Sequence, residues 1–506
     1  MTFLGAVLLF AAASIVTAQE VKLTIRVLPE SSARAVIEGS CAPTAVWSFR
    51  DSYAGVLNLG SRVENLKLFD ASGTEIFGRK IAPGQFQAAQ LASKFRYEIS
   101  LVPPVQGANA ARVSWLNSER GVLMLGDLLP TGFSGIPNGP VGGKAKAHVF
   151  LRFSLSEGWV VHSNETQNPG GEFEVTDVDS AVFAIGNRLR ISKTSISGVT
   201  LSLVTAGEWA FTDLEALDLA GKAFKAHRDV FGGAPSRQAR LILFPYPQIG
   251  PPDKWSAETR GSSVTLLIGK LPSRIAALAR LSVPLTHEFL HFWVPNGLAL
   301  TGDYDWFYEG FTIYQAARTS VQLGLLTFPE FLNAISRAYD AYIMGLDRDR
   351  WSLVEASRRR WTGGESVVYS KSLVIAFLYD LNVRSQSRSK HSLDDVYRNI
   401  FRGYRIPEAR PGAGTSISGQ GSDGNEVAIK SLDSNSGVKD FGRLFIRNAV
   451  TISLPEQLAP FGLKSETIGL RTYISVNQTL TRQQRDLLHE LGYNDYVRSP
   501  GQRKPS

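Results

Sequence analysis

Cysteine is almost absent from this sequence, because Cys41 is the only one among 506 residues. A single thiol excludes an intramolecular disulfide, so we expect the fold to be stabilised by its apolar core. Long apolar runs are also missing after the first residues. No later segment offers the roughly 18 uninterrupted apolar residues of a membrane-spanning helix, so the sequence predicts no membrane span.

A concentrated excess of charge is missing too. The chain is 20% charged and 43% hydrophobic, an ordinary globular composition that excludes disorder of the whole. The net charge is +8, but the Lys and Arg residues are scattered along the chain. The one dense basic cluster is Arg358, Arg359 and Arg360. Since no nucleic-acid-binding motif accompanies this cluster, we expect a solvated basic face and no nucleic-acid partner.

Residues 1–18 have the pattern of a signal peptide. An apolar stretch runs to Val16, and small residues end it at Ala18, before Gln19. This pattern favours cleavage after Ala18 and export to the periplasm or the extracellular medium. No Lys or Arg precedes the apolar stretch, however, so a buried first strand is the alternative.

The next part of the chain, residues 19–205, has the pattern of an antiparallel β-sandwich domain. Apolar and polar residues alternate over residues 21–27, and similar short runs follow at 148–153 and 200–204. Glycine and proline interrupt these runs repeatedly, as expected for turns between strands.

The pattern changes after Thr212, where a helical period begins and continues through Phe231. Apolar runs at 240–244 and 264–268 then predict a mixed sheet flanked by helices, and residues 272–400 are helical by period. We therefore assign residues 206–400 to a catalytic α/β domain. Residues 401–506 are predicted to form a C-terminal helical region. Within it, residues 411–437 are rich in glycine and are expected to form a long loop that contains a short helix near Glu426.

The clearest motif is His-Glu-Phe-Leu-His at residues 287–291. Residues four apart share one face of a helix, so His287 and His291 can present ring nitrogens to one metal ion. Glu288 is rotated so that it reaches a water molecule on that ion. We expect a short helix, with Pro284 in its first turn and the turn at 295–297 ending it.

A hydrolytic zinc site needs a third protein ligand, and Glu309 is the candidate. It lies among aromatic residues at 304–312, at the start of another helical stretch, where a buried carboxylate needs a partner. With one Zn²⁺ per chain, the ion would activate a water molecule and Glu288 would act as general base on a peptide bond. A phenol could stabilise the oxyanion, and Tyr369, at the head of an apolar helix, is in a suitable place, although such a tyrosine is more often part of a core.

Residues 287–293 and 306–312 resemble the glycyl aminopeptidase family of bacterial zinc metallopeptidases, relatives of aminopeptidase N with a thermolysin-like catalytic domain. The similarity extends to the Tyr-Ser-Lys-Ser segment that begins at Tyr369 and to residues 179–186. It implies zinc ligands at His287, His291 and Glu309, a general base at Glu288 and a transition-state stabiliser at Tyr369. The fold class it implies is α+β and multidomain.

The resemblance also implies an anchor for the α-amine of the substrate. Glu258 is the nearest match to the glutamate that family members use, although the glycines and the histidine around it are missing, and an exposed loop glutamate is the alternative. The spacing between His291 and Glu309 is one residue shorter than is usual in aminopeptidase N, and Ser372 stands where the family has glycine. The residues after 465 are too few for the PDZ domain of many family members.

We therefore expect an exported zinc aminopeptidase with a peptide substrate. A zinc endopeptidase or a di- or tripeptidase on the same site is the alternative within this class. A peptide-binding protein whose catalysis has lapsed is the alternative of another class, but retention of the general base Glu288 argues against it. Asp303 and Asp305 are candidates for orienting the zinc histidines.

Overall fold

The computed structural model describes residues 20–28, 33–105, 109–133, 147–248, 254–407 and 421–494. The proposed signal peptide lies outside these residues. The chain forms two compact units, the first from Met1–Pro103 and Val113–Asn187 and the second from Pro104–Arg112 and Arg188–Ser506. Among the described residues, none of the helices combines the length and the hydropathy that crossing a bilayer requires.

The first unit contains two β-sheets that share one apolar core. The nine-stranded sheet has the order β11 (Thr166–Gln167), β12 (Phe173–Val175), β9 (His148–Ser154), β1 (Glu20–Leu28), β2 (Arg34–Ser48), β6 (Gln85–Ser100), β3 (Val63–Phe69) and β4 (Glu75–Ile76), with β5 (Gly78–Ala82) also on β6. The four-stranded sheet has the order β10 (Val160–Ser163), β13 (Val182–Gly186), β8 (Arg120–Met124) and β7 (Trp115–Leu116).

Aromatic side chains join these two sheets. The ring of Phe153 on β9 lies 5.1 Å from that of Phe183 on β13, centroid to centroid. The strand pairs described in this unit are antiparallel, as predicted, with one exception: β1 and β9 run parallel. Alternation along residues 21–27 places Val21, Leu23, Ile25 and Val27 in the core.

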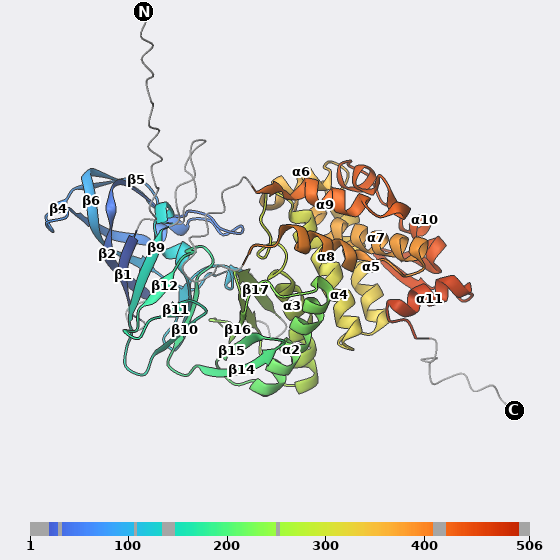
Figure 1. Ribbon diagram of the computed structural model, residues 1–506, viewed down its shortest axis with the longest axis horizontal. Helices are drawn as coiled ribbons and strands as arrows, with labels where there is room; N and C mark the ends of the chain where they lie inside the picture. The colour runs from blue at the N-terminus through green and yellow to red at the C-terminus, as the bar shows by residue number, and fades with distance from the viewer. Residues whose placement is uncertain are drawn as a thin grey trace, which may run out of the picture. The chain divides into compact units, whose positions relative to one another are not determined.

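The second unit contains the predicted mixed sheet with helices packed against it (Figure 1). Its strands lie in the order β14 (Arg190–Ile196), β15 (Val199–Thr205), β16 (Gln238–Pro245), β18 (Ser263–Ile268) and β17 (Trp255–Arg260). Helix α2 (Asp213–Phe231) contacts β14 and β15, and α3 (Arg274–Leu290) contacts β17 and β18. The side chain of Thr212 caps α2 by accepting from the backbone N–H of Glu215, which explains why the helical period begins there.

The remaining helices of this unit follow α3 along the chain. In order they are the π-helical segment η4 (Trp306–Phe311), α4 (Thr312–Gln322), α5 (Phe328–Met344), α6 (Leu353–Arg358), the 3-10 turn η5 (Arg360–Thr362), the π-helical segment η6 (Val367–Lys371), α7 (Ser372–Ser387), α8 (Leu393–Tyr404), α9 (Gly424–Asp433), the 3-10 turn η7 (Ser436–Val438), the π-helical segment η8 (Gly442–Ile446), α10 (Leu454–Leu458), the 3-10 turn η9 (Ala459–Phe461) and α11 (Arg482–Glu490). Two small sheets, β19 (Leu300–Thr301) with β20 (Ser422–Asp423) and β21 (Leu463–Ile468) with β22 (Arg471–Val476), complete it.

The domain boundary differs from the sequence-based one. Strands β14 and β15 were expected in the β-sandwich, which was predicted to end at residue 205. In the structure β15 pairs parallel with β16, so both strands belong to the sheet of the second unit. Alternation identifies a strand but not its partner, because partners are chosen by contacts distant in sequence.

The predicted start of one helix was also wrong. Pro284 lies inside α3 rather than in its first turn, since the helix begins at Arg274, where Ser273 caps it through the N–H of Ala276. The short helix predicted near Glu426, within the loop at 411–437, is confirmed: it is α9, a helix of ten residues whose N-terminus is capped by Asp423. Residues 408–420 of that loop lie outside the described part of the chain.

Candidate active site

The two histidines of the motif lie on one face of α3, near its C-terminal end. His287 is in the last turn, and His291 follows as the capping residue with a helical backbone conformation. Their Nε2 atoms are 3.2 Å apart, so both nitrogens point to the same place. The Nδ1 atom of His291 is 2.9 Å from the carbonyl oxygen of Val294, which fixes the orientation of that ring.

Glu309 comes from η4 and completes a triangle with the two histidines. Its Oε2 lies 3.5 Å from Nε2 of His287 and 3.7 Å from Nε2 of His291. Ligand atoms about 2.0–2.1 Å from a tetrahedral zinc ion are separated by about 3.4 Å. The three observed separations, 3.2, 3.5 and 3.7 Å, therefore suit one zinc ion held by two imidazoles and a carboxylate.

Glu288 lies beside this triangle and is held by the edge strand of the sheet. The hydroxyl of Thr259 on β17 donates to Oε2 of Glu288 over 2.6 Å. Burial raises the pKa of the Glu288 carboxyl to about 7, although the charge of His291 and the bond from Thr259 oppose the rise. A donor atom of Glu288 also lies within 4.8 Å of those of both histidines, but its bond to Thr259 and its raised pKa suit a proton acceptor better than a ligand.

Tyr369 lies on η6, and a glycine allows its segment to approach that of Glu309. A Cβ atom added at Gly310 would lie 2.2 Å from Cβ of Ser372 and 2.7 Å from the carbonyl oxygen of Val368. The Glu-Gly pair thus puts the candidate ligand and the tyrosine on two π-helical segments in direct contact. Burial raises the pKa of the Tyr369 phenol well above its usual value, so the hydroxyl keeps its proton at neutral pH.

Arg360 is part of the site, and its role was not predicted. Its Nη1 donates to Oδ1 of Asp305 over 2.9 Å, and its Nη2 pairs with Oε1 of Glu309 at 2.8 Å and donates to the Tyr369 hydroxyl oxygen. Burial opposes ionisation of Glu309, but Arg360 and the two histidines outweigh it and lower the pKa of that carboxyl to about 2.

The expected solvated basic cluster is therefore wrong for Arg360, whose side chain is only 11% exposed, and correct for Arg358 and Arg359. The chain turns into η5 at Arg360 and directs its side chain inward. The aromatic neighbour Trp361 was the only local signal that this arginine differs from the two before it.

In the described structure, neither of the two aspartates that were candidates for orienting the histidines is seen to contact one of them. Asp305 pairs with Arg360, Asp303 is exposed, and the carbonyl of Val294 takes the place proposed for a carboxylate at His291. Within the described part of the chain, Nδ1 of His287 has no hydrogen-bond partner.

Glu258 lies on β17, the strand at the edge of the sheet, and not in an exposed loop. It is partly buried, opposite Thr265 of β18, and next to Thr259 in sequence. Its negative charge contributes to the raised pKa of Glu288, so the two carboxyl groups are electrostatic neighbours.

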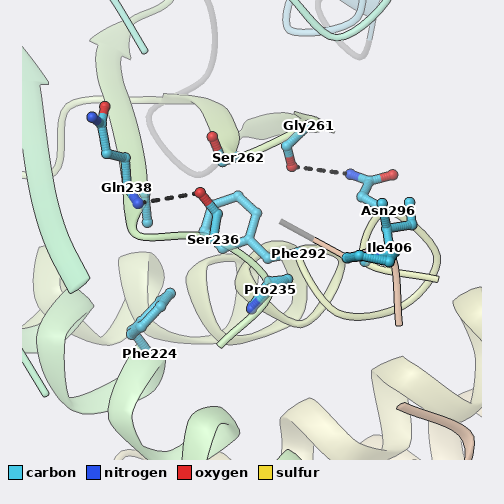
Figure 2. Close-up of a pocket in the computed structure, with 12 residues that line it drawn as sticks. Phe224, Pro235, Ser236, Gln238, Gly261, Ser262, Phe292, Asn296 and Ile406 are labelled. Atoms are coloured by element: carbon cyan, nitrogen blue, oxygen red, sulfur yellow. Dashed lines mark hydrogen bonds between the residues drawn. The ribbon is translucent and has the colours of Figure 1, made fainter. Parts of the chain in front are cut away.

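A cavity of about 230 Å³ lies close to this site but carries different chemistry. Figure 2 shows residues of α2, of the β17–β18 turn and of the segment after α3 around it, with Asn296 donating to the carbonyl of Gly261. None of the 12 described residues that line it has a titratable side chain. This cavity therefore supplies no acid, base or metal ligand, and the candidate active site is the cluster around His287.

Solved structures of known proteins share this architecture. An aminopeptidase N family protein from Idiomarina loihiensis is similar with a TM-score of 0.71 and 17% identity, over 88% of this chain and 79% of that one. The fold is that of an aminopeptidase N family protein. An M1 zinc metallopeptidase from Deinococcus radiodurans has a TM-score of 0.52 and 12% identity, over 87% of this chain and 95% of its own.

A variant of the Deinococcus M1 enzyme, bound to a Tyr-Ser-Ala substrate, has a TM-score of 0.52 and 13% identity over 87% of this chain and 96% of that one. No protein-family model and no curated protein matches this sequence. The sequence predicted an α+β, multidomain fold, and the structure, with its several sheets and many helices, shares the fold of these M1 metallopeptidases.

Proposed function

We propose that this protein is an exported zinc aminopeptidase. The observation that carries the proposal is the triangle of His287, His291 and Glu309, whose edges suit one zinc ion, with Glu288 and Tyr369 beside it. The M1 fold and the Tyr-Ser-Ala substrate of the related Deinococcus enzyme support a peptide substrate for this chain as well.

His287, His291 and Glu309 would hold the zinc ion. When bound, zinc supplies a Lewis acid that polarises the scissile carbonyl and makes a water molecule more acidic. Glu288 then accepts a proton from the attacking water at Oε1, because its Oε2 already accepts from Thr259. The same carboxyl returns the proton to the leaving amine, and its raised pKa of about 7 suits both transfers.

Tyr369 stabilises the charge that develops on the carbonyl oxygen. Its hydroxyl is protonated at neutral pH and its oxygen already accepts a bond from Arg360, so its own hydrogen is directed to another acceptor. A fixed donor of this kind contributes most when charge develops in the transition state.

Cleavage from the amino end of a peptide is the more specific part of the proposal, and Glu258 supports it. Its carboxylate lies on the edge strand, close enough to Glu288 to raise the pKa of that group. A carboxylate in this place meets the α-ammonium of a substrate through a charge-assisted hydrogen bond.

Matched peptides with a free or an N-acetylated amino end test this proposal. The zinc-loaded protein should release single residues in order from the free peptide and spare the acetylated one. Glu258→Ala should remove this preference and raise KM at least as much as it lowers kcat, because the contact forms already in the ground state. Glu466→Ala, an exposed position on β21, is the matched control.

Other outcomes identify the alternatives. Equal cleavage of free and acetylated peptides would support a zinc endopeptidase, and cleavage limited to the shortest peptides a di- or tripeptidase. Peptide binding without any hydrolysis by the zinc-loaded protein would support a binding protein whose catalysis has lapsed.

Export is supported by the apolar segment and the small residues that end at Ala18. It places the peptidase in the periplasm or outside the cell.

A further inference from the structure

The guanidinium of Arg360 joins three side chains of the candidate site. Its Nη1 donates to Asp305 over 2.9 Å, and its Nη2 contacts Oε1 of Glu309 at 2.8 Å and the hydroxyl oxygen of Tyr369. These partners come from η4 and η6, whereas Arg360 lies in η5 between α6 and η6. One cation therefore links the two segments that carry the candidate ligand and the candidate oxyanion donor.

The surroundings fix the plane of this guanidinium. Its central carbon lies 4.3 Å from the ring centre of Trp361, 5.0 Å from that of Tyr369 and 5.9 Å from that of Tyr308. Asp305 pairs with the other terminal nitrogen, Nη1. An arginine has several N–H donors in one rigid plane and can serve all three oxygens, whereas the single ammonium of a lysine cannot reproduce that geometry.

The two oxygens of Glu309 are divided between Arg360 and the histidines. Oε1 is paired with Arg360, and Oε2 is 3.5 and 3.7 Å from the two Nε2 atoms. Without Arg360, rotation of the carboxylate would be restrained far less, and its ligand oxygen would leave the triangle more often. A fixed carboxylate loses less entropy when it binds a metal ion.

At Tyr369 the same nitrogen determines which way the hydroxyl can donate. Arg360 donates a hydrogen bond to the phenolic oxygen, and the phenol cannot donate back because a guanidinium has no acceptor atom. Its O–H hydrogen is left for an oxyanion, and the adjacent positive charge strengthens that donation.

From these contacts we propose that Arg360 is a positioning residue, which aims Oε2 of Glu309 at the metal ion and the Tyr369 hydroxyl at the reacting carbonyl. This inference rests on the proposed zinc peptidase function. It assigns Arg360 no contact with substrate, so its removal should change zinc affinity and kcat and leave KM nearly constant.

The test compares Arg360→Met and Arg360→Lys with Arg358→Met, a control at an exposed position two residues away. Zinc affinity is measured by competition with a chromogenic chelator, and kcat and KM on a free peptide at saturating zinc. Arg360→Met should bind zinc about 10–100-fold more weakly, as when other outer-shell partners are removed. Its kcat should fall about 10²–10³-fold, and Arg358→Met should resemble the wild type in all three quantities.

Arg360→Lys keeps the charge and tests the fork geometry. Compared with Arg360→Met, it should regain part of the zinc affinity and little of kcat. It also provides the test if the methionine variant does not fold. The loss in kcat caused by either Arg360 variant should shrink when Tyr369 is already phenylalanine, because part of the effect acts through that hydroxyl.

Two results would overturn the inference. The first is a folded Arg360→Lys variant whose zinc affinity and kcat equal those of the wild type. The second is an Arg360 variant that binds zinc normally and whose loss in kcat is just as large in the Tyr369→Phe background. A wild-type protein that neither binds zinc nor cleaves peptides would instead refute the proposed function itself, so the two failures are distinguishable.

Discussion

At the scale of single residues, Glu288→Gln separates metal binding from chemistry. The amide keeps the shape of the side chain and can still accept from Thr259, so zinc binding should persist. Turnover should fall by about 10²–10⁴-fold, because the amide cannot take a proton from water. The measurement is steady-state kinetics of the variant and the wild type at matched zinc content. Near-normal activity of the variant would require another general base.

A second prediction at this scale concerns the oxyanion donor. Tyr369→Phe removes the hydroxyl and keeps the ring that packs against Arg360, so kcat should fall about 10²–10³-fold with zinc affinity unchanged. Thermal unfolding of the same variant is the control. If the melting temperature fell sharply while kcat held, the tyrosine would be structural.

Spacing predicted His287, Glu288 and His291, because helix geometry alone brings residues four apart together. Glu309 followed from the chemistry of zinc, which needs a third ligand, and from the apolar residues around it. Arg360 could not be found in this way. It meets Glu309, 51 residues earlier in the chain, and a run of three arginines is usually solvated.

At the scale of elements, the contact between η4 and η6 makes Gly310 irreplaceable. Gly310→Ala would bring Cβ within 2.2 Å of Cβ of Ser372, the first residue of α7, and within 2.7 Å of the carbonyl oxygen of Val368 in η6, so η4 must move away from both. Overpacking of this kind costs about 1–3 kcal/mol, and kcat should fall because Glu309 and Tyr369 move apart.

Gly403→Ala is the matched control for that substitution. Gly403 lies in α8, and apart from its two chain neighbours and the nearby backbone of its own helix, no described atom lies within 4 Å of a Cβ built there. Alanine in a helix is favoured over glycine by about 1 kcal/mol, so this variant should be as stable as the wild type or more so. Equal melting temperatures for Gly310→Ala and the wild type would contradict the close contact.

The helical character of these segments was predictable, but their π-helical turns were not. Glu309 and Tyr369 both lie in such turns, which occur frequently at functional sites and leave no period of their own in the sequence. Pro284 shows a related difficulty. Proline favours the first turn of a helix, yet Pro284 lies in the middle of α3. The helix continues past the proline because α3 packs against β17, β18 and α4.

At the scale of the whole molecule, strand content and helix content were predictable and the division of the chain was not. The short alternating runs and the helical period after Thr212 correspond to strands and to α2. Strand β14 pairs with β15, its neighbour in sequence, but β15 joins the second sheet by pairing with β16, which begins at Gln238, and no local pattern contains that contact. The segment Pro104–Arg112 likewise belongs to the second unit, although in sequence it lies between strands of the first. Arg260 of β17 donates to the carbonyl of Arg112 and so links the segment to the second unit.

Export makes a prediction about the mature chain. Mass spectrometry of protein recovered from the periplasm or the medium should give an amino-terminal residue at Gln19, because the small residues at 16–18 favour cleavage there. Recovery of a chain that still begins at Met1, in the cytosol alone, would support a buried first strand instead.

Zinc content tests the central claim most directly. Elemental analysis of the purified mature protein should find about one zinc ion per chain, since three ligands converge on one point. The His291→Ala variant, folded by circular dichroism, should have lost it. A full complement of zinc in that variant, or a wild-type protein that cannot be loaded with zinc, would contradict the assignment of the metal centre.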